Sequence, residues 1–333
     1  MPSHVERRQL VALLASSAFL ATPLAAFAQR GSKVPTVGIL WHAGSAEQEG
    51  PYFKAMVEGF ATLGYIDGRN IKLEHRFPNE TPERFKSMAA ELVRANVDVL
   101  IGVGATVSVV VKNATTTIPV VFTLAANPVA SKLVESLARP GGNVTGLSNM
   151  SVDLSTKRLQ LLMEAISGLS RVALLVNPSE PPVPAYIAEG EAAASQLGVT
   201  QQVFEARSLD EIEPAFDAMA KAQMQAVVLG AGGLLYQARR ITPKLAVARR
   251  LPVCAWSKET FEDGALMSYG ADQLAIIKRT AALVDKILKG ARPAEIPVEQ
   301  PSRLQLLLNL RTAKAIGLEI SPAVLARADD VIE

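Results

Sequence analysis

The chain has 333 residues, with 34 Lys and Arg against 32 Asp and Glu, and a formal net charge of +2. It contains no long run of basic residues, so nucleic acid is not expected as a partner. This length exceeds what one hydrophobic core usually fills, which predicts two lobes. Cys254 is the single cysteine and lies in an apolar run, so no internal disulfide can form and packing alone must stabilise the fold.

The N-terminal residues are typical of a signal peptide rather than of a folded segment. Arg7-Arg8 give a positively charged start, residues 10–20 are apolar, and Ala26-Phe27-Ala28 is a small-x-small cleavage site. We expect cleavage after Ala28, which removes residues 1–28 and leaves a periplasmic protein. An uncleaved N-terminal anchor is the alternative. The two arginines loosely resemble a twin-arginine signal, but the rest of that motif is poor, which favours the Sec route.

The first half of the mature chain alternates between strand and helix patterns. Strands are expected at residues 36–41, 70–77, 97–103, 118–124 and 143–148, and helices at 52–63, 82–95, 105–114 and 129–137. The run from Val97 to Val103 is continuously apolar, which indicates a parallel sheet covered on both faces. The segment Ala105–Ala114 has helical length, although its valines also suit a strand.

The second half repeats the same units. Helices are expected at residues 154–166, 186–197, 209–222, 235–249, 272–289, 311–316 and 322–327, and strands at 171–176, 199–204, 226–229, 252–256, 264–269 and 303–309. Residues 292–301 carry prolines and are expected to be extended. Two α/β series with a late return of the chain predict an α/β fold of two doubly wound parallel-sheet lobes. We expect an N-terminal lobe of residues 34–148 plus about 265–295, and a C-terminal lobe of 149–264 plus about 296–333.

Two loops at the carboxyl ends of neighbouring strands frame a binding-site hypothesis, because ligands of such sheets bind at that edge. They are Gly104-Ala105-Thr106 and Ala126-Asn127-Pro128. A helix that starts at Gly104 offers free backbone N–H groups and the Thr106 hydroxyl, which suit a carboxylate or another anion. An ordinary strand-to-helix turn is the alternative. Val107 stands where a dinucleotide fingerprint needs its third glycine, so that motif is not supported.

Short motifs in order along almost the whole mature chain carry a family resemblance. They are VGIL at 37–40, FATLGYIDGRN at 60–70, AELVRANVDV at 90–99, TTIPVVF at 116–122, LARPGGNVTG at 137–146, VALLVNP at 172–178, GALMSYGAD at 264–272, NLRTAKAIG at 309–317 and ARADDVIE at 326–333. Together they resemble the periplasmic substrate-binding proteins of ABC transporters with the periplasmic binding protein type 1 fold. More narrowly, they resemble the tryptophan/tyrosine type of this family.

The resemblance implies a monomeric two-lobed receptor that closes on a small molecule and delivers it to ABC permease and ATPase subunits. The implied ligand is an amino acid, aromatic or hydrophobic, and no cofactor is expected. With the strand-end tryptophans added, the expected ligand contacts are Trp41, His42, Ser45, Gly104, Ala105, Thr106, Ala126, Asn127, Asn177, Gly230, Ala231, Trp256, Ser257, Tyr269 and Asp272. The chain departs from the family pattern at Trp41-His42, where a small or polar residue is usual, and at Asn127, where Asp is frequent.

The aromatic candidates each allow two interpretations. Trp41 and Trp256 fall at predicted carboxyl ends of strands and could face a ligand from opposite sides of a cleft. Alternatively, each fills the bottom of its lobe's core. Tyr236 and Tyr269 carry the same ambiguity.

The polar candidates also have structural alternatives. Asp272 is the expected partner of a ligand ammonium group, but it also opens a predicted helix and could serve only as its N-cap. Glu259 and Asp263 are weaker candidates for that role. Asn127 and Asn177 each precede a proline, which also makes them ordinary turn residues.

Motifs of catalysis or metal binding do not occur in this sequence. His42 and His75 are far apart along the chain, and HExxH, CxxC and GxSxG are missing. We therefore expect a binding protein with no catalytic residue and no metal site, which closes about hinges near Ser148, Tyr269 and residues 297–301. A sensory receptor of the same fold is the first alternative, and an α/β enzyme with an unrecognised site is the second.

Overall fold

The computed structural model describes residues 34–333, so the expected signal peptide and its cleavage site after Ala28 lie outside the described residues. Within residues 34–333 the strands form two sheets, one of five strands and one of seven. We call each sheet with its covering helices a lobe. No helix in this part of the chain combines the length and the hydrophobicity that a membrane span needs.

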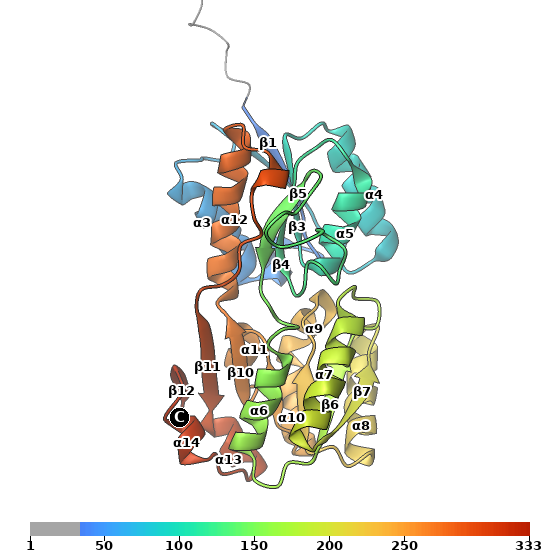
Figure 1. Cartoon of the computed structure of the whole chain (residues 1–333), viewed down its shortest axis with the longest axis vertical. Helices are drawn as coiled ribbons and strands as arrows, with labels where there is room; N and C mark the ends of the chain where they lie inside the picture. The colour runs from blue at the N-terminus through green and yellow to red at the C-terminus, as the bar shows by residue number, and fades with distance from the viewer. Residues whose placement is uncertain (1–33) are drawn as a thin grey trace, which may run out of the picture. The chain divides into compact units, whose positions relative to one another are not determined.

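The first lobe is a parallel sheet between two helical layers. Its strands run in the order β2-β1-β3-β4-β5. They are β1 (Thr36–Leu40), β2 (Lys72–Arg76), β3 (Val99–Val103), β4 (Val120–Ala125) and β5 (Val144–Ser148), and the helices are α2 (Ala46–Glu49), α3 (Pro51–Thr62), α4 (Pro82–Arg94), α5 (Ala105–Ala114) and α12 (Gln273–Leu288). Helices α3 and α12 lie side by side on one face, and α4 and α5 cover the other (Figure 1). Both faces of β3 are therefore buried, as its apolar run predicts.

The second lobe is a mixed sheet in the order β12-β11-β10-β9-β8-β6-β7. Its strands are β6 (Arg171–Val176), β7 (Thr200–Glu205), β8 (Ala226–Leu229), β9 (Val253–Ala255), β10 (Met267–Ala271), β11 (Leu304–Asn309) and β12 (Asp330–Ile332). Its helices are α6 (Ser155–Ala165), α7 (Val183–Leu197), α8 (Ile212–Lys221), α9 (Gly233–Gln237), α10 (Thr242–Arg249), α11 (Lys258–Glu262), α13 (Leu310–Ile316) and α14 (Pro322–Leu325), with 3-10 turns at Leu209–Glu211 and Ala238–Arg240 and, in the segment that follows α12, at Pro293–Glu295. The predicted α/β fold of two lobes is confirmed. The antiparallel pair β10–β11 is the exception to parallel pairing, because the chain re-enters this sheet from the first lobe.

The chain passes between the lobes after β5, after β10 and again before β11. The expected lobe bounds near residues 265 and 296 are wrong in detail. Strand β10 pairs with β9 of the second sheet, so residues 267–271 belong to the second lobe. Residues 296–299 run beside β5 of the first lobe, where the Glu299 N–H donates to the Gly146 carbonyl at 3.0 Å. An apolar pattern predicts a strand, but it does not say which sheet the strand joins.

Two predicted helices are also wrong. Residues 129–137 form turns, and Lys132 has a φ of 56° that a right-handed helix cannot contain. The single helix expected at residues 235–249 is divided into α9, a 3-10 turn and α10. Pro243 in the first turn of α10 is the reason, because its ring cannot continue a preceding helix. The short elements α2, α11 and β12 are not predicted, since three to five residues carry little periodicity.

Helix α5 forms despite its valines because it folds back tightly onto β3. A Cβ atom at Gly102 would lie 2.7 Å from the Cα of Ser108, so a glycine is needed for this approach. Gly104 then turns the chain with a φ of 89°, and its carbonyl accepts the Ser108 N–H at 3.0 Å. This geometry puts the N-terminus of α5 at the carboxyl edge of the first sheet, as the binding-site hypothesis requires.

Candidate functional site

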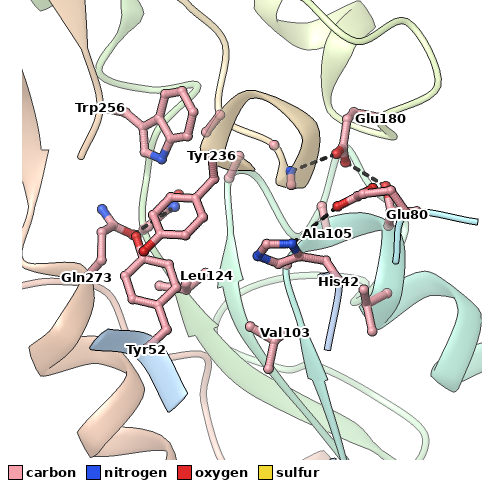
Figure 2. Close-up of a pocket in the computed structure, with 18 of the residues that line it drawn as sticks. His42, Tyr52, Glu80, Val103, Ala105, Leu124, Glu180, Tyr236, Trp256 and Gln273 are labelled. Atoms are coloured by element: carbon pink, nitrogen blue, oxygen red, sulfur yellow. Dashed lines mark hydrogen bonds and ion pairs between the residues drawn. The ribbon is translucent and has the colours of Figure 1, made fainter. Parts of the chain in front are cut away.

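A cavity lies where the carboxyl ends of the strands of both lobes meet (Figure 2). The space between its walls is about 560 Å³ when the open solvent at its mouth is included. The residues that line it are His42, Tyr52, Glu80, Phe85, Val103, Gly104, Ala105, Thr106, Val107, Leu124, Ala126, Asn149, Glu180, Ala231, Gly232, Gly233, Tyr236, Trp256 and Gln273. Figure 2 shows His42, Glu80 and Glu180 at one end and Tyr52, Tyr236 and Trp256 at the other. The cavity is therefore polar at one end and aromatic at the other.

His42 follows β1 and is held between two carboxylates of its own lobe. Its Nε2 lies 3.2 Å from Glu49 Oε2, and its Nδ1 lies 3.2 Å from Glu80 Oε1. Glu49 is itself fixed, because its Oε1 accepts the N–H groups of His42 and Ala43. Burial alone would lower the pKa of His42, but the two carboxylates outweigh burial and raise this pKa to about 9. His42 is therefore a cation at neutral pH.

Glu180 comes from the loop after β6 in the second lobe and reaches the first lobe. The Thr106 hydroxyl at the start of α5 donates to Glu180 Oε2 at 2.5 Å, and the Gly233 N–H at the start of α9 donates to Oε1 at 3.1 Å. Only 6% of Glu180 is exposed. Burial, and then the charge of Glu80, raise the pKa of Glu180 to about 7. Contact between the lobes thus creates a carboxyl group that holds its proton near neutral pH.

Aromatic side chains from both lobes meet at the other end. Tyr52 of α3 stacks on Tyr236 of α9, with ring centroids 4.4 Å apart. The Tyr52 hydroxyl also donates to Glu259 Oε2 across the lobes at 3.3 Å. The Arg239 guanidinium lies 4.4 Å from the centroid of the Tyr236 ring and holds that ring from outside the cavity. With Trp256, these rings offer an apolar and polarisable wall to a ligand.

Two further polar features face the cavity. Helix α5 has no side-chain cap at Gly104, so its first N–H groups are left to a ligand or to solvent. Asn149 Nδ2 donates to Gln273 Oε1 at 3.2 Å, which joins the first crossing segment to the start of α12. The hinge region therefore contributes to the cavity wall.

Seven of the predicted contacts line the cavity, and their role in ligand binding stays a prediction. They are His42, Gly104, Ala105, Thr106, Ala126, Ala231 and Trp256. These seven residues come from strand ends or the turns after them in both lobes.

The expectation that Trp41 faces the cavity is wrong, and its alternative, core filling, is observed. Trp41 is 0% exposed and stacks on Phe77 with ring centroids 6.2 Å apart. Its Nε1–H donates to His75 Nδ1. The reason is the two-residue period of a strand, which sends Trp41 to the same side as Val37 and Ile39, toward the core under α3.

The remaining predicted contacts lie outside the cavity wall and have local structural roles. Ser45, Ser257 and Asp272 are the N-caps of α2, α11 and α12. Asn127 and Asn177 accept backbone N–H groups within their own turns, from Ala130 and Ser179. Gly230 and Asn177 line a smaller neighbouring hollow of about 180 Å³. Tyr269 packs in the second-lobe core, and its carbonyl accepts the Arg158 Nε–H at 2.8 Å.

The acidic residues of the cavity are the main omission of the sequence analysis. Glu80 and Glu180 each follow a strand by a few residues, in loops that end at the same edge as the predicted ones. An acidic residue in such a loop is the available signal, since Glu180 lies only three residues after the predicted contact Asn177. Tyr52, Asn149 and Gln273 gave no such signal, because each reaches the cavity from a helix or a crossing segment. Among residues 34–333, no cluster of His, Cys, Asp and Glu side chains has an arrangement that could hold a metal ion.

The fold and the cavity between its two lobes define a class, the two-lobed α/β solute-binding proteins. The family model of ABC transporter substrate binding proteins matches residues 47–332, and the chain belongs to this family. This confirms the resemblance drawn from the short motifs.

Individual relatives agree with this assignment. A tyrosine-binding protein of Clostridioides difficile (strain R20291) is 24% identical over 269 residues, which cover 80% of this chain and 76% of that protein. A conserved domain protein of Vibrio cholerae has a similar structure, with a TM-score of 0.84, 26% identity and coverage of 90% and 100% of the two chains.

Two further solved structures differ in how closely they match. An ABC domain from Streptococcus pneumoniae in complex with L-Trp gives a TM-score of 0.82 at 23% identity, covering 90% of this chain and 100% of that one. The ligand-free, open structure of a substrate binding protein from Clostridium difficile gives 0.64 at 23% identity, covering 90% and 99%. Both likenesses show that this chain has the same fold as these two proteins.

Proposed function

We propose that this chain is the periplasmic receptor of an ABC importer, and that it captures an aromatic or hydrophobic amino acid or a close relative of one. The two lobes close on the ligand, and the closed form delivers it to a membrane permease. The names of the tyrosine-binding relative and of the L-Trp complex support this ligand class.

The observation that carries the proposal is the pair of walls that the lobes bring together. Tyr52 of the first lobe and Tyr236 of the second stack directly, and Trp256 completes an aromatic end. Neither lobe alone supplies this surface, so a ring bound there would contact both lobes and stabilise closure.

The polar end supports a ligand with charged groups. The uncapped N-terminus of α5 suits an anion, whereas Glu80 and Glu180 suit an ammonium group. The apolar side chains of Val103, Leu124 and Ala126 also line the cavity. A short amine with an aromatic side chain matches this sequence of environments.

The direct test is a set of thermal melts of residues 29–333 against an amino-acid panel. The protein is first unfolded and refolded so that retained ligand is removed. A ligand at ~100 times its Kd should add about 2.7 kcal/mol to the free energy of unfolding and raise the Tm. Trp256→Leu should abolish most of that shift. Phe53→Leu is the matched control, because Phe53 packs on Trp41 outside the cavity. Flat melts across the aromatic and branched-chain amino acids would remove this ligand class.

Export and transport need separate measurements. The leader-like residues 1–28 support export, and the mass of the periplasmic protein should correspond to a chain that begins at Gln29. Uptake of the labelled ligand should fall in cells that lack this chain. Normal uptake together with a lost transcriptional response would instead favour a sensory receptor.

A further inference from the structure

The acidic end of the cavity holds more negative than positive charge. Glu80 comes from the first lobe and Glu180 from the second, and both reach the backbone of Gly233. The Gly233 N–H donates to Glu180 Oε1 at 3.1 Å, and a Cβ atom at Gly233 would lie 2.1 Å from Glu80 Oε1. Closure therefore brings two carboxyl groups of opposite lobes to one backbone position.

The cavity contains little positive charge to balance the carboxyl groups of Glu80 and Glu180. Among the described residues, His42 is the single basic side chain on the cavity wall, and no Lys or Arg joins it. His42 Nε2 is already paired with Glu49, which is buried behind the wall. One cation therefore faces three carboxyl groups, and the excess is negative when they are ionised. A buried charge without a partner is costly, so an ionised pair needs a cation or a proton.

The anion-binding end of α5 is also partly occupied. The Thr106 hydroxyl donates to Glu180 Oε2, so a carboxylate of the protein already lies at this helix N-terminus. A ligand carboxylate bound to the first N–H groups of α5 would lie near Glu180 and be repelled by it whenever Glu180 is ionised.

We propose that the site selects ligands of net positive charge, namely aromatic amines whose ammonium group lies between Glu80 and Glu180 and whose carboxylate is missing or neutralised. This proposal rests on the proposed function and narrows its ligand class. A zwitterionic amino acid contributes no net charge, whereas an amine without the carboxylate cancels one of the excess negative charges.

The protonation of Glu180 agrees with this selection. Burial and the charge of Glu80 raise the pKa of Glu180 to about 7, while hydrogen bonds from Thr106 and Gly233 and the charge of His42 act in the opposite direction. A proton on Glu180 thus takes the place that the ligand ammonium fills. Binding of the amine near neutral pH should release that proton to the buffer.

The test compares probes that share one ring and differ in charge. Tyramine is a cation, L-tyrosine a zwitterion and 3-(4-hydroxyphenyl)propionate an anion, and tryptamine with L-tryptophan forms the matching indole pair. Each is titrated calorimetrically into refolded protein near neutral pH, in buffers of different ionisation enthalpy. We expect the amine to bind about tenfold more tightly than the amino acid, because the amine lacks the carboxylate that the cavity carboxyl groups repel across a partly screened distance. Binding of the amine should also release a proton to the buffer.

Variants identify the groups responsible. Glu180→Gln and Glu80→Gln should each reduce the ratio of amine to amino-acid affinity toward one, since each removes one negative charge. Glu191→Gln, at an exposed position of α7, should leave the ratio unchanged. A preference for the amino acid over the amine, or a ratio unaffected by both cavity variants, overturns this inference and leaves the proposed function standing. Binding of none of the probes overturns both.

Discussion

Raising the pH should open the unliganded protein, because the closed state alone buries Glu180 against Thr106 of the other lobe. The ordinary pKa of a glutamate is 4.5, and in the closed state burial and the charge of Glu80 raise that of Glu180 to about 7. In an open state Glu180 faces water, and its pKa returns toward the ordinary value. The closed state therefore binds the Glu180 proton more tightly than the open state does.

The direction and the size of the pH effect on opening follow from this difference in the pKa of Glu180. The closed state has its full advantage below pH 4.5 and loses it as the pH rises toward 7. A difference between 4.5 and about 7 corresponds to about 3 kcal/mol, or a change of roughly three hundredfold in the ratio of closed to open molecules. His42 does not titrate in this window, since its pKa is raised to about 9. Its carboxylate partners Glu49 and Glu80 belong to its own lobe and stay with it on opening.

Small-angle scattering measures this opening directly through the radius of gyration. The refolded, ligand-free protein should expand between about pH 5 and about pH 8, the interval that spans the Glu180 titration. Glu180→Gln should remain closed at both values, and Glu191→Gln should behave like the unchanged protein. A radius that stays constant, or that changes equally in Glu180→Gln, would refute the reasoning.

Three substitutions separate the site from the fold. Gly233→Ala places a methyl group 2.1 Å from Glu80 Oε1, a movable side-chain atom, so we expect ligand affinity to fall about tenfold, while the urea midpoint is unchanged. Gly146→Ala meets the fixed Phe122 carbonyl oxygen at the same 2.1 Å, and should instead lower the free energy of unfolding by about 1–3 kcal/mol in a urea titration. Trp41→Ala should cost about 3–5 kcal/mol of stability by the same measurement. Its calorimetric ligand affinity, measured where the variant is folded, should be unchanged, and a loss of affinity would place Trp41 in the site after all.

Most of the fold could be predicted from the sequence, because buried parallel strands have a simple pattern of continuous apolar residues. Val99–Val103 is apolar at every position, and both of its faces are covered. The pattern does not contain pairing, which is why β10 and residues 296–299 were assigned to the wrong lobes. The helix predicted at residues 129–137 is wrong for a different reason. The turn there depends on Asn127 Oδ1, which accepts the Ala130 N–H, and on the positive φ of Lys132.

The sequence predicts a residue of the candidate site only where the end of a strand sets the position of that residue. Gly104 and Trp256 directly follow strands β3 and β9, and topology alone brings them to the cavity edge. Glu180 instead acquires its surroundings from Thr106 and Glu80 of the other lobe. Its burial and its altered acidity are properties of the closed pair of lobes, so no local pattern in the sequence could contain them.

The position of α12 in the chain affects the order in which the protein can fold during synthesis. This helix covers the same face of the first sheet as α3, and its Thr280 hydroxyl donates to the Thr123 hydroxyl of β4 at 2.9 Å. Yet α12 is made only after the strands β6 to β10 of the other lobe. A growing chain therefore carries an incomplete first lobe, with part of its apolar sheet uncovered, until residue 288 has emerged. The lobe that begins the sequence is thus completed late, which keeps the nascent chain from reaching its native state early.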